Sequence, residues 1–372
     1  MMKFGIDNIK ENFACLDGLK LALICNGTSF SSSGVSTIEI INEYADLALL
    51  LAPEHGIRGD KDAGESFGTD KDAVTGLDVI SLYRRGSQDL PEKELDEAGI
   101  NALVYDIQDI GMRCYTYIST LYLALHYCAR MKKPLVVLDR PNPLGRQIEG
   151  LILEESCKSF VGIYPIASRY GLTCGEFANL VNLELKLGVD LRIVRCSDYN
   201  PLLLYPQLGK RWIVPSPAII GFENALLYSA FFLLEATNVS EGRGTSSPFS
   251  FLGAPFADSD KVCECLHQAR CPGVEFMPAD FTPDNSKHRG VLCHGVMARI
   301  TDAGAFNGIR TGLVLLEAFK TLYPDDFALD REKLKRLLGT RKSIAQVMED
   351  GFGIVKRDEE EFASRARKAM IY

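Results

Sequence analysis

The chain has 372 residues, of which 47% are hydrophobic, and its formal net charge is -8. This apolar content is sufficient for at least one sizeable core and favours two domains. An acidic chain without a clustered basic face is not expected to bind nucleic acid, and the absence of any run of 18 apolar residues predicts no membrane span.

Short apolar runs alternate with helical patterns through the first half of the chain. The runs are rich in Leu and β-branched residues and are almost unbroken, which is typical of strands buried on both faces of a parallel sheet. Amphipathic spacing predicts helices between them, at 35–44 and 114–131. We therefore predict an open α/β sheet with strands at 20–26, 47–52, 79–83, 102–106, 135–138 and 191–196.

Polar side chains follow four of these runs, at the point where each run ends. Because the carboxyl ends of parallel strands meet at one edge of a sheet, these side chains are expected to surround a single crevice. The sequence therefore predicts an active site at this edge. The residues are Asn26, then Glu54 and His55, then Asp106, Gln108 and Asp109, and finally Asp139, Arg140 and Asn142.

A long polar segment, residues 55–78, follows the second run and shows almost no apolar periodicity. Long loops inside compact domains are uncommon and tend to be functional, because ordering them costs conformational entropy. Arg58 and Glu65 lie on this loop and are candidate substrate-binding residues.

The second half of the chain changes in character. Thr173 and Glu176 match a capping box at the start of a helix that Gly188 ends. Four prolines then interrupt the pattern between 201 and 217, which predicts a boundary between a domain at 1–212 and a domain at 213–372. A helix at 223–235, a polar loop at 238–249, a strand within 290–300 and several terminal helices predict a smaller α+β domain.

Eleven cysteines are scattered through predicted strands and helices. Cys263, Cys265, His267 and Cys271 form one cluster, but its CxCxH spacing does not match a zinc pair of the CxxC type. We interpret the cluster as structural, with metal binding as the alternative. Many free thiols favour a reducing compartment, hence the cytoplasm, although a periplasmic or secreted location stays open if a leader was removed.

Several chemistries lack their signature motifs. The first strand-to-helix turn, CNGTSFSSSG, has no GxGxxG, and neither GxxxxGK[ST] nor the GxSxG of serine hydrolases occurs. We therefore expect no cofactor and no metal. Carboxylates remain abundant at the predicted edge, and paired carboxylates with different pKa values are the usual means of cleaving glycosidic bonds.

Seven sequence blocks carry a resemblance to a known family. Together they resemble the NamZ-type exo-β-N-acetylmuramidases, glycoside hydrolase family 171, over nearly the whole chain. The resemblance implies a Rossmann-like domain joined to a smaller C-terminal domain, and release of N-acetylmuramic acid from the non-reducing ends of peptidoglycan fragments in the cleft between them. The blocks are PEHGIRGD (53–60), AGE (63–65), TGLDVISLY (75–83), YDIQDIGMRCYTY (105–117), DRPNPLG (139–145), VPSPAI (214–219) and TNVSEGRGT (237–245).

The resemblance places the catalytic glutamate of the family at Glu54. A carboxyl at the end of a buried strand agrees with this, since desolvation raises its pKa and keeps it protonated as a general acid. The alternative is a glutamate that only anchors the following loop. Asp106 and Asp109 are candidates for the second role, base or transition-state stabiliser, and the alternative for both is capping of the next helix.

Arginine is the expected partner of the lactyl carboxylate of muramic acid, because a guanidinium group binds a carboxylate at two points. Arg58, Arg113, Arg140 and Arg243 are the candidates, and pairing with nearby acidic residues is the structural alternative.

Other candidates are expected to contact the sugar. His55 would bond a hydroxyl group or a neighbouring carbonyl, and Tyr115 and Tyr117 would offer a hydroxyl, stack on the ring or pack in the core. Glu241 and Arg243 would cross the cleft or tie the domains together.

We thus predict a cofactor-independent glycoside hydrolase with a saccharide or muropeptide as its partner. The first rival is a non-catalytic muropeptide-binding protein that uses the same crevice. The second is an amidase or esterase, which the missing metal ligands and nucleophile elbow disfavour. The sequence does not indicate an oligomeric state or whether the anomeric configuration is retained.

Overall fold

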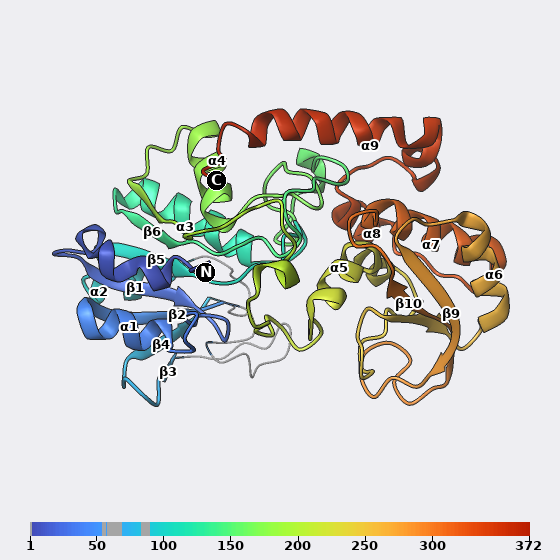
Figure 1. Cartoon of the computed structure of the whole chain (residues 1–372), viewed down its shortest axis with the longest axis horizontal. Coiled ribbons are helices and arrows are strands. Elements are labelled where there is room, and N and C mark those ends of the chain that lie inside the picture. Colours follow the sequence, from blue (N-terminus) through green and yellow to red (C-terminus); the bar gives the residue numbers. More distant parts are fainter. Residues whose placement is uncertain (1, 54–56, 58–68, 83–89) are drawn as a thin grey trace.

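The computed structural model describes residues 2–53, 57, 69–82 and 90–372, and within this part of the chain it has two domains (Figure 1). The first contains a seven-stranded sheet in the order β3-β4-β2-β1-β5-β6-β7. Only β3 is antiparallel to its neighbour. The strands are β1 Lys20–Cys25, β2 Asp46–Ala52, β3 Thr69–Lys71, β4 Asp78–Ser81, β5 Ala102–Asp106, β6 Leu135–Leu138 and β7 Leu191–Val194.

The strand order confirms the Rossmann-like α/β fold. Numbered along the chain, the six parallel strands follow the order 3-2-1-4-5-6 of dinucleotide-binding folds. β1 pairs with β2 on one side and with β5 on the other, so the order reverses between β1 and β5. Cys25 lies opposite Asp106 in this pairing, which places the loops after both strands together at the carboxyl edge.

The described helices of the first domain are α1 Thr37–Tyr44, α2 Glu92–Glu97, α3 Tyr117–Met131 and α4 Cys174–Glu184. Three of these four, α1, α3 and α4, begin and end close to the predicted positions, whereas α2 was not predicted. Thr173 and Glu176 form the predicted capping box of α4. α3 begins at Tyr117 and not at residue 114, because Arg113 bonds carbonyl groups elsewhere and residues 114–116 form a turn. β3 was not predicted, since its three polar residues show no apolar periodicity.

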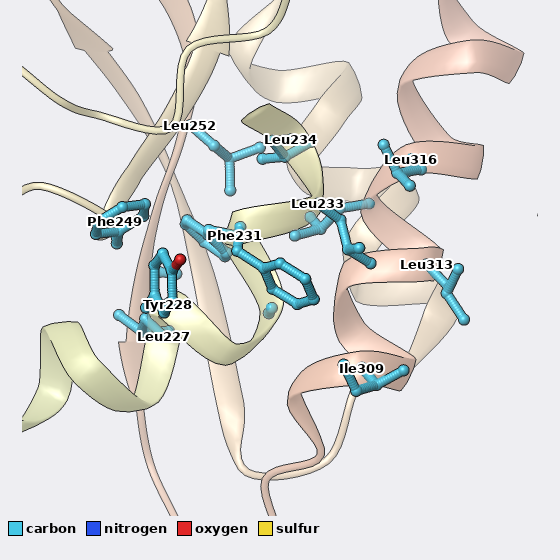
Figure 2. Close-up of a cluster of buried hydrophobic side chains, with 14 of the residues drawn as sticks. Leu227, Tyr228, Phe231, Leu233, Leu234, Phe249, Leu252, Ile309, Leu313 and Leu316 are labelled. Atoms are coloured by element: carbon cyan, nitrogen blue, oxygen red, sulfur yellow. The ribbon is translucent and has the colours of Figure 1, made fainter. Parts of the chain in front are cut away.

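The second domain is smaller and contains an antiparallel sheet in the order β8-β10-β9. Together with its helices, this sheet confirms the predicted α+β class. The strands of the sheet are β8 Phe251–Ala254, β9 Val274–Phe281 and β10 Cys293–Ile300, and the helices of the domain are α5 Phe222–Phe231, α6 Ser259–Ala269, α7 Gly308–Leu322 and α8 Arg331–Leu338. α5 is buried from Asn224 to Phe231 and continues as a 3-10 turn, Phe232–Ala236. Figure 2 shows this segment beside α7, and Leu233 lies on its side that faces α7.

The connection between the domains is apolar. Trp212 and Phe222 pack against both the core of the second domain and the core beneath β1. The boundary at 212/213 stays a prediction.

A long helix, α9 Ile344–Ala366, leads from the second domain back to the first (Figure 1). Phe362 and Ala366 are fully buried in the core that contains α3 and α4. Beyond the helix, the Tyr372 hydroxyl donates to Asp139 of the first domain. We call residues 344–372 the C-terminal strap, because they tie the two domains together.

The strap is held to α4 by an ion pair. Arg365 donates to both carboxylate oxygens of Glu184, at 2.8 and 2.7 Å, and to the carbonyl of Pro165. We expect Arg365→Ala to lower the free energy of unfolding by about 1–2 kcal/mol, since a bidentate charged hydrogen bond is lost. Thermal melting measures the effect, with Arg357→Ala, an exposed position on the same helix, as the control. Equal melting temperatures for the two variants would contradict the prediction.

Candidate active site

The loops after β1 and β5 are tied together by hydroxyl groups at the carboxyl edge. Thr28 donates through Oγ1 to Oδ1 of Asn26 at 2.5 Å and accepts from the backbone N–H of Gln108 at 3.0 Å. Ser29 donates to the carbonyl of Asp106 at 2.5 Å. This edge, where a Rossmann-like fold binds its ligand, is therefore rigid. Thr28 and Ser29 were not predicted as site residues, although the run of hydroxyl residues after the first strand was visible.

Asp106 and Arg140 form a buried ion pair. Arg140 donates through Nε to Oδ1 at 2.5 Å and through a terminal nitrogen to Oδ2 at 2.8 Å, and the Thr37 hydroxyl also donates to Oδ2. The exposed fractions are 0% for Asp106 and 2% for Arg140. These contacts occupy both side chains, so they do not support the second catalytic role predicted for Asp106 or the carboxylate-binding role predicted for Arg140.

Asp139 and Asn142 are also engaged inside the first domain. Asp139 accepts hydrogen bonds from Thr173, Gly175 and Tyr372, and burial raises the pKa of its carboxyl to about 6. Asn142 accepts from the backbone of Leu144 and donates to the carbonyl of Leu172. Both residues position loops at the edge, and neither contact set supports the binding role predicted for them.

Arg113 holds the two domains together. Its guanidinium donates to the carbonyls of Leu151 and Ile166 in the first domain and Leu337 in the second, at 2.7, 2.8 and 3.0 Å. The side chain is buried, and desolvation lowers its pKa. A Cβ on Gly339 would lie 2.5 Å from this guanidinium, so the close approach requires glycine. These contacts give Arg113 a structural role and do not support the carboxylate-binding role predicted for it.

Asp109 and Gln108 differ from their neighbours because each retains an unpaired oxygen. Asp109 accepts through Oδ2 from Tyr170 at 2.5 Å and from the backbone of Gly111 at 2.7 Å. Within the described part of the chain, nothing donates to Oδ1 of Asp109 or to Oε1 of Gln108. Burial raises the pKa of Asp109 to about 7. A carboxyl that exchanges a proton near neutral pH at a ligand-binding edge is a candidate catalytic group.

The raised pKa of Asp109 predicts a pH-dependent stability. The folded protein retains this proton to higher pH than the unfolded chain, so the contribution of Asp109 to stability falls as the pH rises from about 4 to 7. Asp109→Asn removes this pH-dependent loss of stability, because the amide does not ionise. We expect the melting temperature of the variant, relative to the wild type, to be higher at pH 8 than at pH 5.

The exposed Asp325 provides the control for this measurement. Asp325→Asn is expected to leave the difference between pH 5 and pH 8 unchanged. A difference for Asp109→Asn that does not depend on pH would show that the carboxyl is not perturbed.

Tyr115, Tyr117 and Arg243 line a cavity of about 630 Å³ between the two domains, which we call the interdomain cavity. The Tyr117 hydroxyl donates to the carbonyl of Pro215 at 2.5 Å. Arg243 pairs with Glu235 at 2.9 Å and with Glu241 at 3.2 Å. Glu235 is a lining residue that the sequence did not indicate, because it lies in the middle of an apolar segment.

Glu241 is buried behind this cavity. Lys287 donates to it at 2.9 Å, and Arg243 contacts its other oxygen. Lys287 also donates to the carbonyls of Leu234 and Val239, so the ammonium group fixes the base of the loop. Glu241 thus stabilises the loop within the second domain, and its contacts do not support a direct role in sugar binding.

Four predicted residues, Glu54, His55, Arg58 and Glu65, lie outside the described residues. The structure does describe the strand that leads to Glu54: β2 ends at Ala52 and is followed by the buried Pro53. β2 runs parallel to β1, so this segment arrives at the edge that carries Asn26 and Asp109.

The cysteines are free thiols, all eleven of them. Cys263 and His267 lie on α6, and both contact the carbonyl of Phe276 in β9, which is a packing role. Among the residues that the structure describes, no three His, Cys, Asp or Glu side chains are arranged to hold a metal ion. None of the described helices has the length and apolar character that crossing a bilayer requires.

Two family models match the chain: the N-terminal domain of exo-beta-N-acetylmuramidase NamZ at residues 21–223 and the C-terminal domain at residues 226–372. The chain belongs to the NamZ family. A curated relative from Bacillus subtilis, a peptidoglycan beta-N-acetylmuramidase NamZ, is 38% identical over 99% of this chain and 91% of its own length. These matches confirm the family resemblance and the enzyme class, a glycoside hydrolase.

Solved structures of the same fold come from Bacteroides fragilis. One DUF1343 family protein is 32% identical and has a TM-score of 0.90, and a second is 27% identical with a TM-score of 0.79. In both comparisons the similarity covers 100% of this chain and 99% of the solved one. Both domains therefore occur together in these relatives.

Proposed function

We propose that this chain is an exo-acting glycoside hydrolase that releases N-acetylmuramic acid from the non-reducing ends of peptidoglycan fragments, with Glu54 as general acid. The observation that carries the proposal is the arrangement at the carboxyl edge of the sheet, where β2 and β5 both end. At this edge Asp109 has a pKa of about 7 and an oxygen that no described residue bonds. Family membership supplies the substrate class.

We assign the role of general acid to Glu54 because of its position in the sequence. It directly follows the buried Pro53 at the end of a strand that is buried along most of its length. A carboxyl group in such surroundings has a raised pKa and keeps its proton at neutral pH. The proton is then transferred to the glycosidic oxygen as the bond to the leaving sugar breaks.

Asp109 is assigned the second role. Hydrogen bonds from Tyr170 and Gly111 fix Oδ2, whereas no described residue donates to Oδ1, which could therefore accept from a ligand or a water molecule. As a carboxylate, Asp109 would act as a base on water or stabilise the positive charge that develops at the anomeric carbon. The other candidate, Asp106, is neutralised by Arg140 and offers no free oxygen for this role.

We assign binding of the lactyl carboxylate to Arg58, by elimination among the four candidate arginines. Arg113 is occupied by three carbonyl groups and Arg140 by a buried aspartate. Arg243 already contacts two carboxylates. Arg58 lies four residues after Glu54 in the sequence, close to the proposed acid.

Replacement of the proposed acid tests the reaction. We expect Glu54→Gln to lower kcat for a MurNAc-GlcNAc disaccharide by about 10² to 10⁴-fold, because the leaving oxygen loses its proton donor. Proton NMR of the released N-acetylmuramic acid measures the rate. Glu43→Gln, an exposed position on α1, is the matched control and is expected to be as active as the wild type.

The outcomes separate the enzyme from a binding protein. A sugar-binding protein would bind the disaccharide tightly and release no sugar, with or without Glu54. Turnover that survives in Glu54→Gln would refute the role of this residue and leave the enzyme class intact.

Paired substrates test the role of Arg58. The p-nitrophenyl glycosides of N-acetylmuramic acid and N-acetylglucosamine differ only in the lactyl group. We expect Arg58→Ala to reduce kcat/KM for the muramide by about tenfold to a hundredfold, because a charged hydrogen bond contributes about 1.5–3 kcal/mol. The low activity on the glucosaminide is expected to change little. The control is Arg211→Ala, because Arg211 is exposed and lies outside the carboxyl edge and the interdomain cavity. An unchanged preference for the muramide over the glucosaminide in Arg58→Ala would contradict the assignment.

A further inference from the structure

The C-terminal strap ends against the loop that follows β6, residues 139–146, which we call the β6 loop. This loop starts at the carboxyl edge, because β6 runs parallel to β5. The Tyr372 hydroxyl donates to Oδ2 of Asp139 at 2.8 Å and accepts from the backbone N–H of Cys196 at 2.8 Å. Arg146 donates to the Tyr372 carbonyl at 3.3 Å. Tyr372 therefore contacts both the first and the last residue of the β6 loop.

Further contacts of the strap hold the middle of the β6 loop and the helix beside it. The Tyr372 ring packs edge to face on Tyr199, with the centroids 5.0 Å apart, and the Tyr199 hydroxyl accepts from the backbone N–H of Asn142 at 3.2 Å. The backbone N–H of Ile371 donates to Glu176 of α4 at 3.0 Å, and Figure 1 shows the C-terminus beside this helix. Burial raises the pKa of the Tyr372 hydroxyl, so the hydroxyl remains a proton donor.

The β6 loop packs against one of the two donors that fix Asp109. The backbone N–H of Gly111 donates to Oδ2 of Asp109 at 2.7 Å. Gly111 has a φ of +85°, and a Cβ there would collide with the side-chain amide of Asn142. Pro141 of the same loop accepts from the Gln108 side chain at 2.8 Å. The position of Gly111 beside Asp109 thus depends on where the β6 loop lies.

The second donor, Tyr170, adjoins the same loop. Its hydroxyl donates to Oδ2 of Asp109 at 2.5 Å. The next residue, Gly171, has a φ of +64°, and a Cβ there would lie 2.7 Å from the carbonyl oxygen of Arg146. The Arg146 guanidinium also donates to the Gly171 carbonyl at 3.1 Å. Both donors to Asp109 are therefore placed by the loop whose two ends the strap bonds.

We propose that Tyr372 is a positioning residue for the reaction, which acts through the β6 loop to keep the carboxyl group of Asp109 oriented. This inference rests on the proposed function, because it names a residue that serves the group given the second catalytic role. Loss of the Tyr372 hydroxyl leaves Asp139 with its donors Thr173 and Gly175, so the fold persists while the loop loses one restraint. Since the strap starts in the second domain, the orientation of Asp109 depends on how the two domains are joined (Figure 1).

Removal of the Tyr372 hydroxyl tests this role by kinetics. We expect Tyr372→Phe to lower kcat for MurNAc-GlcNAc by about threefold to thirtyfold and to change KM by less than about twofold, because a misplaced catalytic group raises the barrier without weakening substrate binding. Proton NMR of the released N-acetylmuramic acid measures both constants. A variant that had only lost stability would keep the wild-type kcat at any temperature at which it is folded.

The control removes a matched hydroxyl group from the second domain. The Tyr323 hydroxyl, at the end of α7, accepts from the backbone N–H of Asp258 at 2.8 Å. We expect Tyr323→Phe to lower the melting temperature about as much as Tyr372→Phe does, because each loses one hydrogen bond, and to keep the wild-type kcat. Melting curves show that both variants are folded at the assay temperature. An unchanged kcat in Tyr372→Phe, or an equal loss in Tyr323→Phe, would overturn the proposal.

A titration separates failure of this inference from failure of the proposed function. If the wild type releases no sugar, the proposed function fails, and the role of Tyr372 is then judged by carbon-13 NMR of the aspartate carboxyl groups. The Asp109 signal is the one that is missing in Asp109→Asn, and it is expected to titrate near pH 7 in the wild type. In Tyr372→Phe we expect the pKa of Asp109 to rise, because the Gly111 hydrogen bond that stabilises the carboxylate loosens. Identical titration curves in the two proteins would overturn the proposal.

Discussion

The buried ion pair between Asp106 and Arg140 is the constraint on which the ligand-binding edge depends. Asp106 is the last residue of β5, and Arg140 comes two residues after β6. Arg140 also bonds the Phe30 carbonyl in the loop after β1, and Thr37 at the start of α1 donates to Asp106. One pair therefore joins three strand ends and a helix. Removal of one partner from a buried pair typically costs about 3–5 kcal/mol, because the other charge is left without compensation.

The sequence predicted the sheet and its polar edge because these depend on local patterns. Unbroken apolar runs identified the parallel strands, and the residues after them had to meet at one edge. Which edge residues are free to act was not predictable. Asp106 and Asp109 are three positions apart and chemically identical. Arg140 neutralises the first, whereas Tyr170 bonds one oxygen of the second and no described residue bonds the other.

The same limit applies to the second domain. The polar loop at 238–249 was correctly recognised as irregular, but the partners of its charges are far apart in the sequence. Lys287, which compensates Glu241, lies 46 residues away and carries no motif. Arg113 similarly reaches Leu337 across 224 residues. Ion pairs and buried arginines of this kind are set by tertiary packing, so only a structure identifies them.

The C-terminal strap has a consequence for the order in which the protein folds. Asp139, Glu176 and Glu184 belong to the first half of the chain, and each bonds a residue between 365 and 372. On a ribosome that adds about 5–20 residues per second, these late partners emerge on the order of ten seconds or more after the last strand of the parallel sheet. Until then the helices α3 and α4 expose the apolar surface that Phe362 and Ala366 later cover. The Rossmann-like domain is thus completed only after synthesis of the second domain.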